Sequence, residues 1–115
     1  MDSPMIYQHR GLAAGRWSQM TLVEQMANIG SEVERALHWQ AKNNGPFCQK
    51  AVDRALELLD LSLASVRGFP HLKEFARTRE ALVDYFYGNN QYQSTESLWR
   101  KYFLSFVVAV RKKAR

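Results

Sequence analysis

Charged side chains within or beside apolar helical stripes are the residues of this sequence with the clearest potential for chemistry. Arg79 lies between Phe75 and Leu82, at a spacing that places a guanidinium in an otherwise apolar stripe. A lone buried guanidinium is strongly unfavourable, so Arg79 needs an acidic partner. Asp60, in a mostly apolar segment, and Glu32, at the edge of another apolar stripe, are placed to supply it.

Two roles are open for this set of charges, which also includes Arg77. In the first, Arg79 and Asp60 form a buried ion pair that fixes the register of two helices. In the second, the guanidinium lines a pocket between helices and binds an anion. An enzyme with an unrecognised site around Glu32, Asp60, Arg77 and Arg79 would require the second role.

Recognisable catalytic and metal-binding motifs are absent from the sequence. No two of the 3 histidines stand four residues apart, and no H-E-x-x-H, G-x-S-x-G or phosphate-binding glycine motif occurs. The single cysteine, Cys48, stands near a predicted helix start, where a thiol pKa can be lowered, but no base accompanies it. The sequence therefore predicts no metal and no cofactor, and it favours a non-enzymatic role.

Apolar residues at three- and four-residue steps predict four amphipathic helices that must position these side chains. A capping box from Thr21 to Glu24 opens the first helix, which ends near Asn43-Asn44-Gly45 with Gly45 in the left-handed turn. The second helix is expected from Pro46 to the break at 67–70, the third from about His71 to 88–90, and the fourth from 94–95 to Val110.

Helices joined by short loops predict an all-α fold, an antiparallel up-down four-helix bundle. The bundle is expected over residues 18–110, between a flexible N-terminal arm at 1–17 and a basic C-terminal tail at 111–115. No segment approaches the ~20 apolar residues of a membrane span. With one cysteine in the chain, the cytoplasm is the expected location.

Gly30 stands inside the first predicted helix, where glycine costs about 1 kcal/mol relative to alanine. Ala27, one turn earlier, is also small. The pair predicts a close crossing with another helix, and a ligand held against the bare backbone is the alternative.

The fourth predicted helix is apolar on nearly every side. Leu104 and Val108 point away from the stripe that runs from Trp99 to Val110. A helix with apolar residues all round needs more than one partner surface. These two residues and Leu61 are therefore candidates for self-association, although scattered exposed apolar residues are also common.

The charge of the chain is unevenly placed. It carries 16 basic and 11 acidic side chains, yet the stretch from Ser18 to Val110 is formally neutral. The excess lies at the two ends, so nucleic-acid binding would be weak and salt-dependent. Its candidate residues are Arg100, Lys101, Arg111, Lys112, Lys113 and Arg115.

The run EQMANIGSEV at 24–33 resembles the opening signature of a group of small uncharacterised bacterial and archaeal helical proteins. Residues 54–61, 77–86 and 101–103 are also similar to that group. The resemblance implies a helical fold and assigns no functional residue. In size and helix pattern the chain more loosely resembles the four-helix-bundle accessory proteins of diversity-generating retroelements, which form rings that bind nucleic acid, but its neutral body departs from their basic surface.

Three functional hypotheses follow from the sequence. The first is a non-enzymatic helical interaction and assembly module, a homo-oligomer that binds a protein partner. The second is a nucleic-acid-binding accessory protein that uses the basic tail and the start of the fourth helix. The third is an enzyme built on the four charges named above.

Overall fold

The computed structural model describes residues 15–113, and within this range the regular structure is entirely helical. The elements are a short 3-10 helix η1 (Trp17–Gln19), α2 (Leu22–Ala41), α3 (Gly45–Ser65), α4 (Phe69–Tyr87) and α5 (Glu96–Lys113). The predicted all-α class is confirmed. None of these helices combines the length and the apolar character that crossing a lipid bilayer requires.

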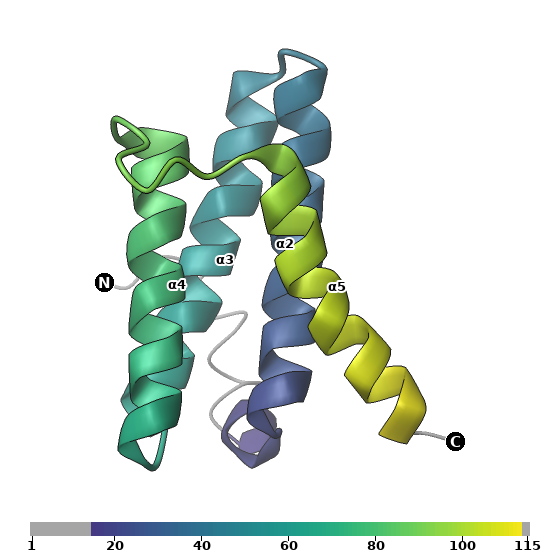
Figure 1. Ribbon diagram of the computed structural model, residues 1–115, viewed down its shortest axis with the longest axis vertical. Helices are drawn as coiled ribbons and strands as arrows, with labels where there is room; N and C mark the ends of the chain where they lie inside the picture. Colours follow the sequence, from purple (N-terminus) through teal and green to yellow (C-terminus); the bar gives the residue numbers. More distant parts are fainter. Residues whose placement is uncertain (1–14, 114–115) are drawn as a thin grey trace.

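The long helices run alternately up and down, as an antiparallel bundle requires (Figure 1). Helix α2 packs against both α3 and α5, and α3 also packs against α4. Helices α4 and α5 draw together near the loop that joins them and separate toward their other ends (Figure 1). The bundle is therefore open along one side, and α5 is positioned mainly by α2.

The start of α2 follows the predicted capping box. The Thr21 side chain accepts a hydrogen bond from the Glu24 backbone N–H at 3.2 Å, and the Glu24 carboxylate accepts one from the Thr21 N–H at 2.8 Å. These bonds satisfy two backbone donors that have no partner within the helix.

The turn between α2 and α3 differs from the sequence prediction. Asn43 takes the left-handed conformation with φ 58°, and Gly45 is already the first residue of α3. Asparagine tolerates this conformation better than most residues. Asn44 then caps α3, because its side-chain oxygen accepts a hydrogen bond from Phe47 N–H at 3.0 Å.

Helices α4 and α5 start close to the predicted positions. Helix α4 begins at Phe69, two residues before the expected start, because Gly68 adopts φ 91° and turns the chain immediately before it. The Thr95 hydroxyl caps α5 by accepting a hydrogen bond from Leu98 N–H at 3.1 Å.

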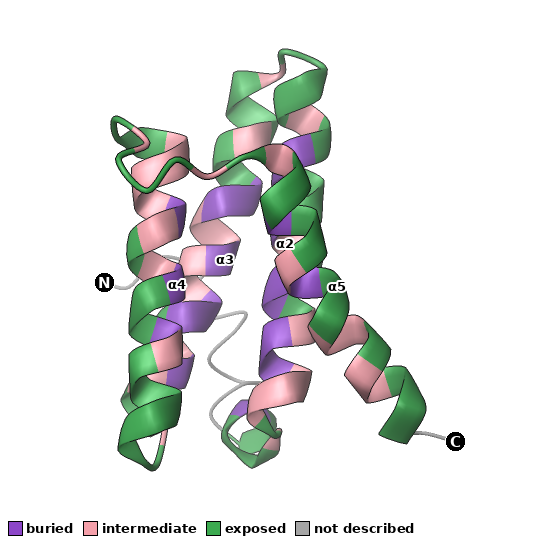
Figure 2. Cartoon of the chain, in the orientation of Figure 1, coloured by how far each residue is buried: buried purple, intermediate pink, exposed green. Residues whose placement is uncertain are grey.

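The core consists of residues from the inward faces of all four long helices and of one residue, Trp17, that was predicted to lie in the N-terminal arm (Figure 2). Trp17, the last residue of the predicted arm, is buried in the core. Residues 1–14 of the expected arm lie outside the described residues. Leu61, expected at a subunit contact, is instead half-buried and packs against the core.

A closed polar network holds η1 to the bundle. Trp17 Nε1 donates to Ser62 Oγ at 3.0 Å, and Ser62 Oγ donates to Gln25 Oε1 at 2.7 Å. Gln25 Nε2 returns a bond to the Trp17 backbone oxygen at 2.7 Å. Because these polar groups satisfy one another, the network can be buried without a large desolvation penalty.

The crossing of α2 and α5 is closest at Gly30. A Cβ atom placed on Gly30 would lie 2.8 Å from Phe103 Cβ and 2.9 Å from the Phe103 ring. Real carbon atoms do not approach so closely without repulsion, so only glycine allows this crossing. The structure therefore contains the predicted close approach of two helices at Gly30.

We expect Gly30→Ala to destabilise the fold, although alanine is the better helix former. The new methyl group meets Phe103 Cβ, which rotation of the Phe103 side chain cannot move, so α5 must shift. Overpacking of this kind outweighs the gain in helix propensity and leaves a net loss of about 1–2 kcal/mol. Urea denaturation followed by circular dichroism measures the change.

Ser31→Ala is the matched control, because Ser31 is exposed on the same helix next to Gly30. Its free energy of unfolding should stay within about 0.5 kcal/mol of the parent chain. A Gly30→Ala chain that is as stable as this control would contradict the close crossing.

Candidate functional site

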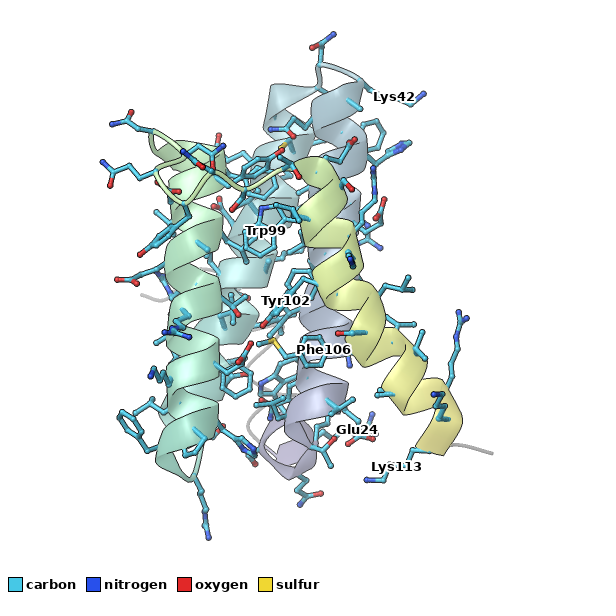
Figure 3. The ribbon with its side chains drawn as sticks, viewed as in Figure 1. Glu24, Lys42, Trp99, Tyr102, Phe106 and Lys113 are labelled. Carbon is cyan, nitrogen blue, oxygen red and sulfur yellow. The ribbon has the colours of Figure 1, made fainter. Side chains whose placement is uncertain are left out.

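The inner face of α5 fixes how the helix is rotated about its own axis. Trp99 and Phe103 are buried, and their rings stack with centroids 5.9 Å apart. Tyr102 and Phe106 extend from the same side of α5 into the space between the helices (Figure 3). With four aromatic rings held inward, the opposite face of α5 must lie in solvent.

That outer face carries two of the sequence-predicted self-association residues. Leu104 is 57% exposed and Val108 is 38% exposed. They stand one turn apart, so they lie next to each other on one face of the helix. Lys101 and Arg111, three residues before and three residues after the pair, give this apolar spot a charged border. Leu61 does not join it, since it packs against the core.

A groove of about 490 Å³ lies between α2 and α5, beside this spot. Its apolar lining includes Val33 and Leu37 from α2 and Val107 from α5. Gly30 contributes bare backbone, and Leu104 stands at the edge of the groove and also lines it. An exposed leucine and an apolar depression are thus adjacent on one surface.

The polar wall of this groove is an ion-pair cluster. Arg100 donates three hydrogen bonds to the Glu34 carboxylate, at 2.9, 3.2 and 3.0 Å, and lies 3.2 Å from Glu96. Hydrogen bonding to Glu34 raises the pKa of the Arg100 guanidinium. Two carboxylates therefore neutralise Arg100, which makes it a poor ligand for phosphate and weakens its predicted role in binding nucleic acid.

The other predicted nucleic-acid residues lie on the exposed face and at the end of α5. Lys101 is exposed, and Arg111, Lys112 and Lys113 form the last helical turn rather than a separate tail. Arg115 lies outside the described residues. Lys113 is drawn beside Glu24 at the start of α2 (Figure 3). The pKa of Glu24 is lowered, first by its hydrogen bonds to Thr21 and then by the charge of Lys113.

Arg79 and Asp60 form the anticipated pair but not the anticipated buried one. Arg79 Nε lies 2.7 Å from Asp60 Oδ1, and Nη2 lies 3.3 Å from Oδ2. Their side chains are 37% and 57% exposed. The buried stripe of α4 consists of Phe75, Thr78 and Leu82, so Thr78 occupies the inward position and Arg79 sits one residue around the helix. An exposed pair of this kind contributes about 0–1 kcal/mol.

The four charges proposed as an enzyme site do not converge. Glu32 binds Arg35 on its own helix at 3.0 Å, and Arg79 is occupied by Asp60. Arg77 is exposed. Between residues 15 and 113, no group of histidine, cysteine and carboxylate side chains could hold a metal ion. Burial raises the pKa of the Cys48 thiol, which is the opposite of nucleophile activation.

A polar link between α4 and α5 was not found from the sequence. The Tyr102 hydroxyl donates to the Glu74 carboxylate and accepts a hydrogen bond from Thr78 Oγ1 at 2.9 Å. Burial, and then the bond to Glu74, raises the pKa of Tyr102 well above its usual value. No motif marks these residues, because they become neighbours only when α5 folds back beside α4.

Tyr102→Phe should cost about 1–2 kcal/mol of stability near neutral pH, because Glu74 and Thr78 lose a partner inside the bundle. The folded-state pKa of Tyr102 is raised, so the stabilisation is full below the unfolded pKa of about 10 and is lost as pH rises further. The stability gap between parent and variant should therefore narrow above about pH 10. Urea denaturation from neutral to alkaline pH measures it.

Tyr92→Phe provides the control for this experiment. Tyr92 lies in the loop between α4 and α5, is exposed, and donates its hydroxyl to the Glu80 carboxylate at 3.3 Å. The free energy of unfolding of this variant should stay close to that of the parent chain, because the Tyr92 hydroxyl is exposed. Equal stability of Tyr102→Phe and the parent chain would show that the link does not hold α5 to α4.

Comparison of the chain with protein families, with curated proteins and with solved structures finds no match. The function is therefore inferred from the residues and surfaces of the chain itself.

Proposed function

We propose that this chain is a non-enzymatic helical assembly module, a cytoplasmic homo-oligomer that serves as an accessory to a protein partner. The observation that carries the proposal is the exposure of Leu104 and Val108, one turn apart, beside the apolar groove between α2 and α5.

The packing of α5 explains why its outer face is available for association. The aromatic rings on the inner face of α5 already fill its contact with the bundle, so turning Leu104 inward would expose Trp99 or Phe103. The outer leucine and valine can leave water only by contacting another molecule. A small apolar centre with a border of Lys101 and Arg111 also has the composition of a protein interface, which is apolar in the middle and polar at the rim.

A non-enzymatic role is supported by the state of the charged side chains. Glu32, Asp60 and Arg79 are held in separate surface ion pairs. A catalytic acid or base needs a partner arrangement that shifts its pKa toward the working pH. Paired surface charges outside a shared cavity do not provide that arrangement.

Nucleic-acid binding through the end of α5 is the weaker proposal. Arg100 is neutralised by Glu34 and Glu96, and the remaining basic side chains cluster in the last turn of the helix. A few clustered cations bind phosphate with strong dependence on salt and without sequence selectivity.

Light scattering of the purified chain tests the assembly proposal. The parent chain should have a mass above that of one 13.3 kDa chain, and Leu104→Glu or Val108→Glu should shift it to the monomer. A buried glutamate at the contact would be desolvated without a partner, which weakens association at least tenfold.

Leu72→Glu is the matched control, because Leu72 is an exposed leucine on α4 (39%), away from the groove. It should keep the mass of the parent chain. A parent chain that stays monomeric at every concentration would overturn the proposed assembly.

A further inference from the structure

We propose that two copies of the chain pair through antiparallel α5 helices, related by a two-fold axis near Leu104 and Val108, with Leu104 of each copy seated in the α2–α5 groove of the other. This inference rests on the proposed self-association and specifies its geometry.

The surface is self-complementary, as a two-fold contact requires. The projecting Leu104 and the apolar groove lie side by side on the same face of the molecule. A two-fold axis between them places each leucine in the other copy's groove, so one patch supplies both halves of the contact. A head-to-tail contact would use the leucine of one copy and leave its own groove unfilled.

The spacing of residues along α5 sets the register. Lys101, Leu104, Val108 and Arg111 follow steps of three, four and three residues, which is the seam of a helix pair. Only the central two are apolar. Antiparallel alignment of the apolar centre places Leu104 of one copy beside Val108 of the second copy and next to Val107, which lines the groove, twice by symmetry. Lys101 then lies near Arg111 of the second copy at the solvent-exposed edge, where salt screens their repulsion.

Charge selects the antiparallel arrangement over the parallel one. The first turn of α5 holds Glu96, and Glu34 of α2 lies close to it, because both bind Arg100. The last turn holds three cations at 111–113. A parallel pair would place all three cations of one copy beside the same three cations of the second, which is a denser like-charge contact than the Lys101–Arg111 pairs of the antiparallel register. The antiparallel register instead brings Lys112 of one copy alongside the Arg100 turn of the second, where Glu34 and Glu96 supply carboxylates.

Disulfide trapping tests this geometry in the full chain. In a Cys48→Ala background, which removes the single native cysteine, one preparation carries Lys101→Cys and another carries Arg111→Cys. Mixing the two under mild oxidation should yield a mixed disulfide dimer severalfold in excess of any dimer formed by either preparation alone. In the proposed register each introduced cysteine lies roughly 15 Å along the helix axis from the identical cysteine of the second copy, which is too far for a disulfide.

Lys73→Cys on α4 is the control and should form no dimer, since Lys73 is exposed on a different helix. Disulfides within each single preparation, without the mixed species, would indicate parallel pairing and overturn this inference while leaving the assembly proposal intact. The parent chain could be dimeric by light scattering while none of the cysteine variants forms a disulfide. That result would place the contact elsewhere and would overturn this inference while leaving the assembly proposal intact. A monomeric parent chain would overturn both proposals.

Discussion

The contact of the Gly30 backbone with the side chain of Phe103 is the constraint on which the rest of the structure depends. Helix α5 has no closely packed neighbour other than α2, because α4 separates from it over much of its length (Figure 1). The absence of a side chain at Gly30 lets α5 approach closely enough to bury Phe103 and stack Trp99 upon it. With those rings inward, the helix geometry leaves Leu104 and Val108 outward.

A second interaction, of different chemistry, completes the position of α5. Tyr102 bridges the space to α4 and bonds Glu74 and Thr78. A long aromatic side chain with a polar tip suits this place, because its ring packs among Trp99 and Phe106 while its hydroxyl reaches the facing helix. Apolar packing and the Arg100–Glu34 ion pair hold α5 to α2, whereas the hydrogen bonds of Tyr102 hold it to α4. The two contacts restrict rotation of α5 and so keep its outer face in solvent.

The sequence predicted the features that depend on local pattern. Helix periodicity gave the four helices, the capping box at Thr21 was found as expected, and a glycine inside a helix indicated the close crossing at Gly30. Leu104 and Val108 were expected to face away from the core because of their angular position, and they are exposed. These predictions needed no knowledge of how the helices pair.

Features that depend on tertiary packing were missed or misplaced. A rotation of α4 by one residue exchanges Arg79 for Thr78 at the buried position, and no sequence pattern fixes that angle. Trp17 enters the core because Ser62, distant in sequence, accepts its indole N–H, and Gln25 bonds both Ser62 and the Trp17 backbone oxygen. Leu61 packs against the core although periodicity places it off the apolar stripe of α3. In each case the outcome depends on which neighbour covers a side chain, which periodicity along one helix does not contain.

Proton NMR of the isotopically labelled chain tests the central contact most directly, through the Hα resonances of Gly30. A glycine backbone held against the Phe103 ring should show ring-current-shifted Hα resonances and cross-relaxation with the Phe103 ring protons. Hα resonances at ordinary helical positions, with no cross-relaxation to Phe103, would contradict the crossing and with it the orientation of the outer face of α5.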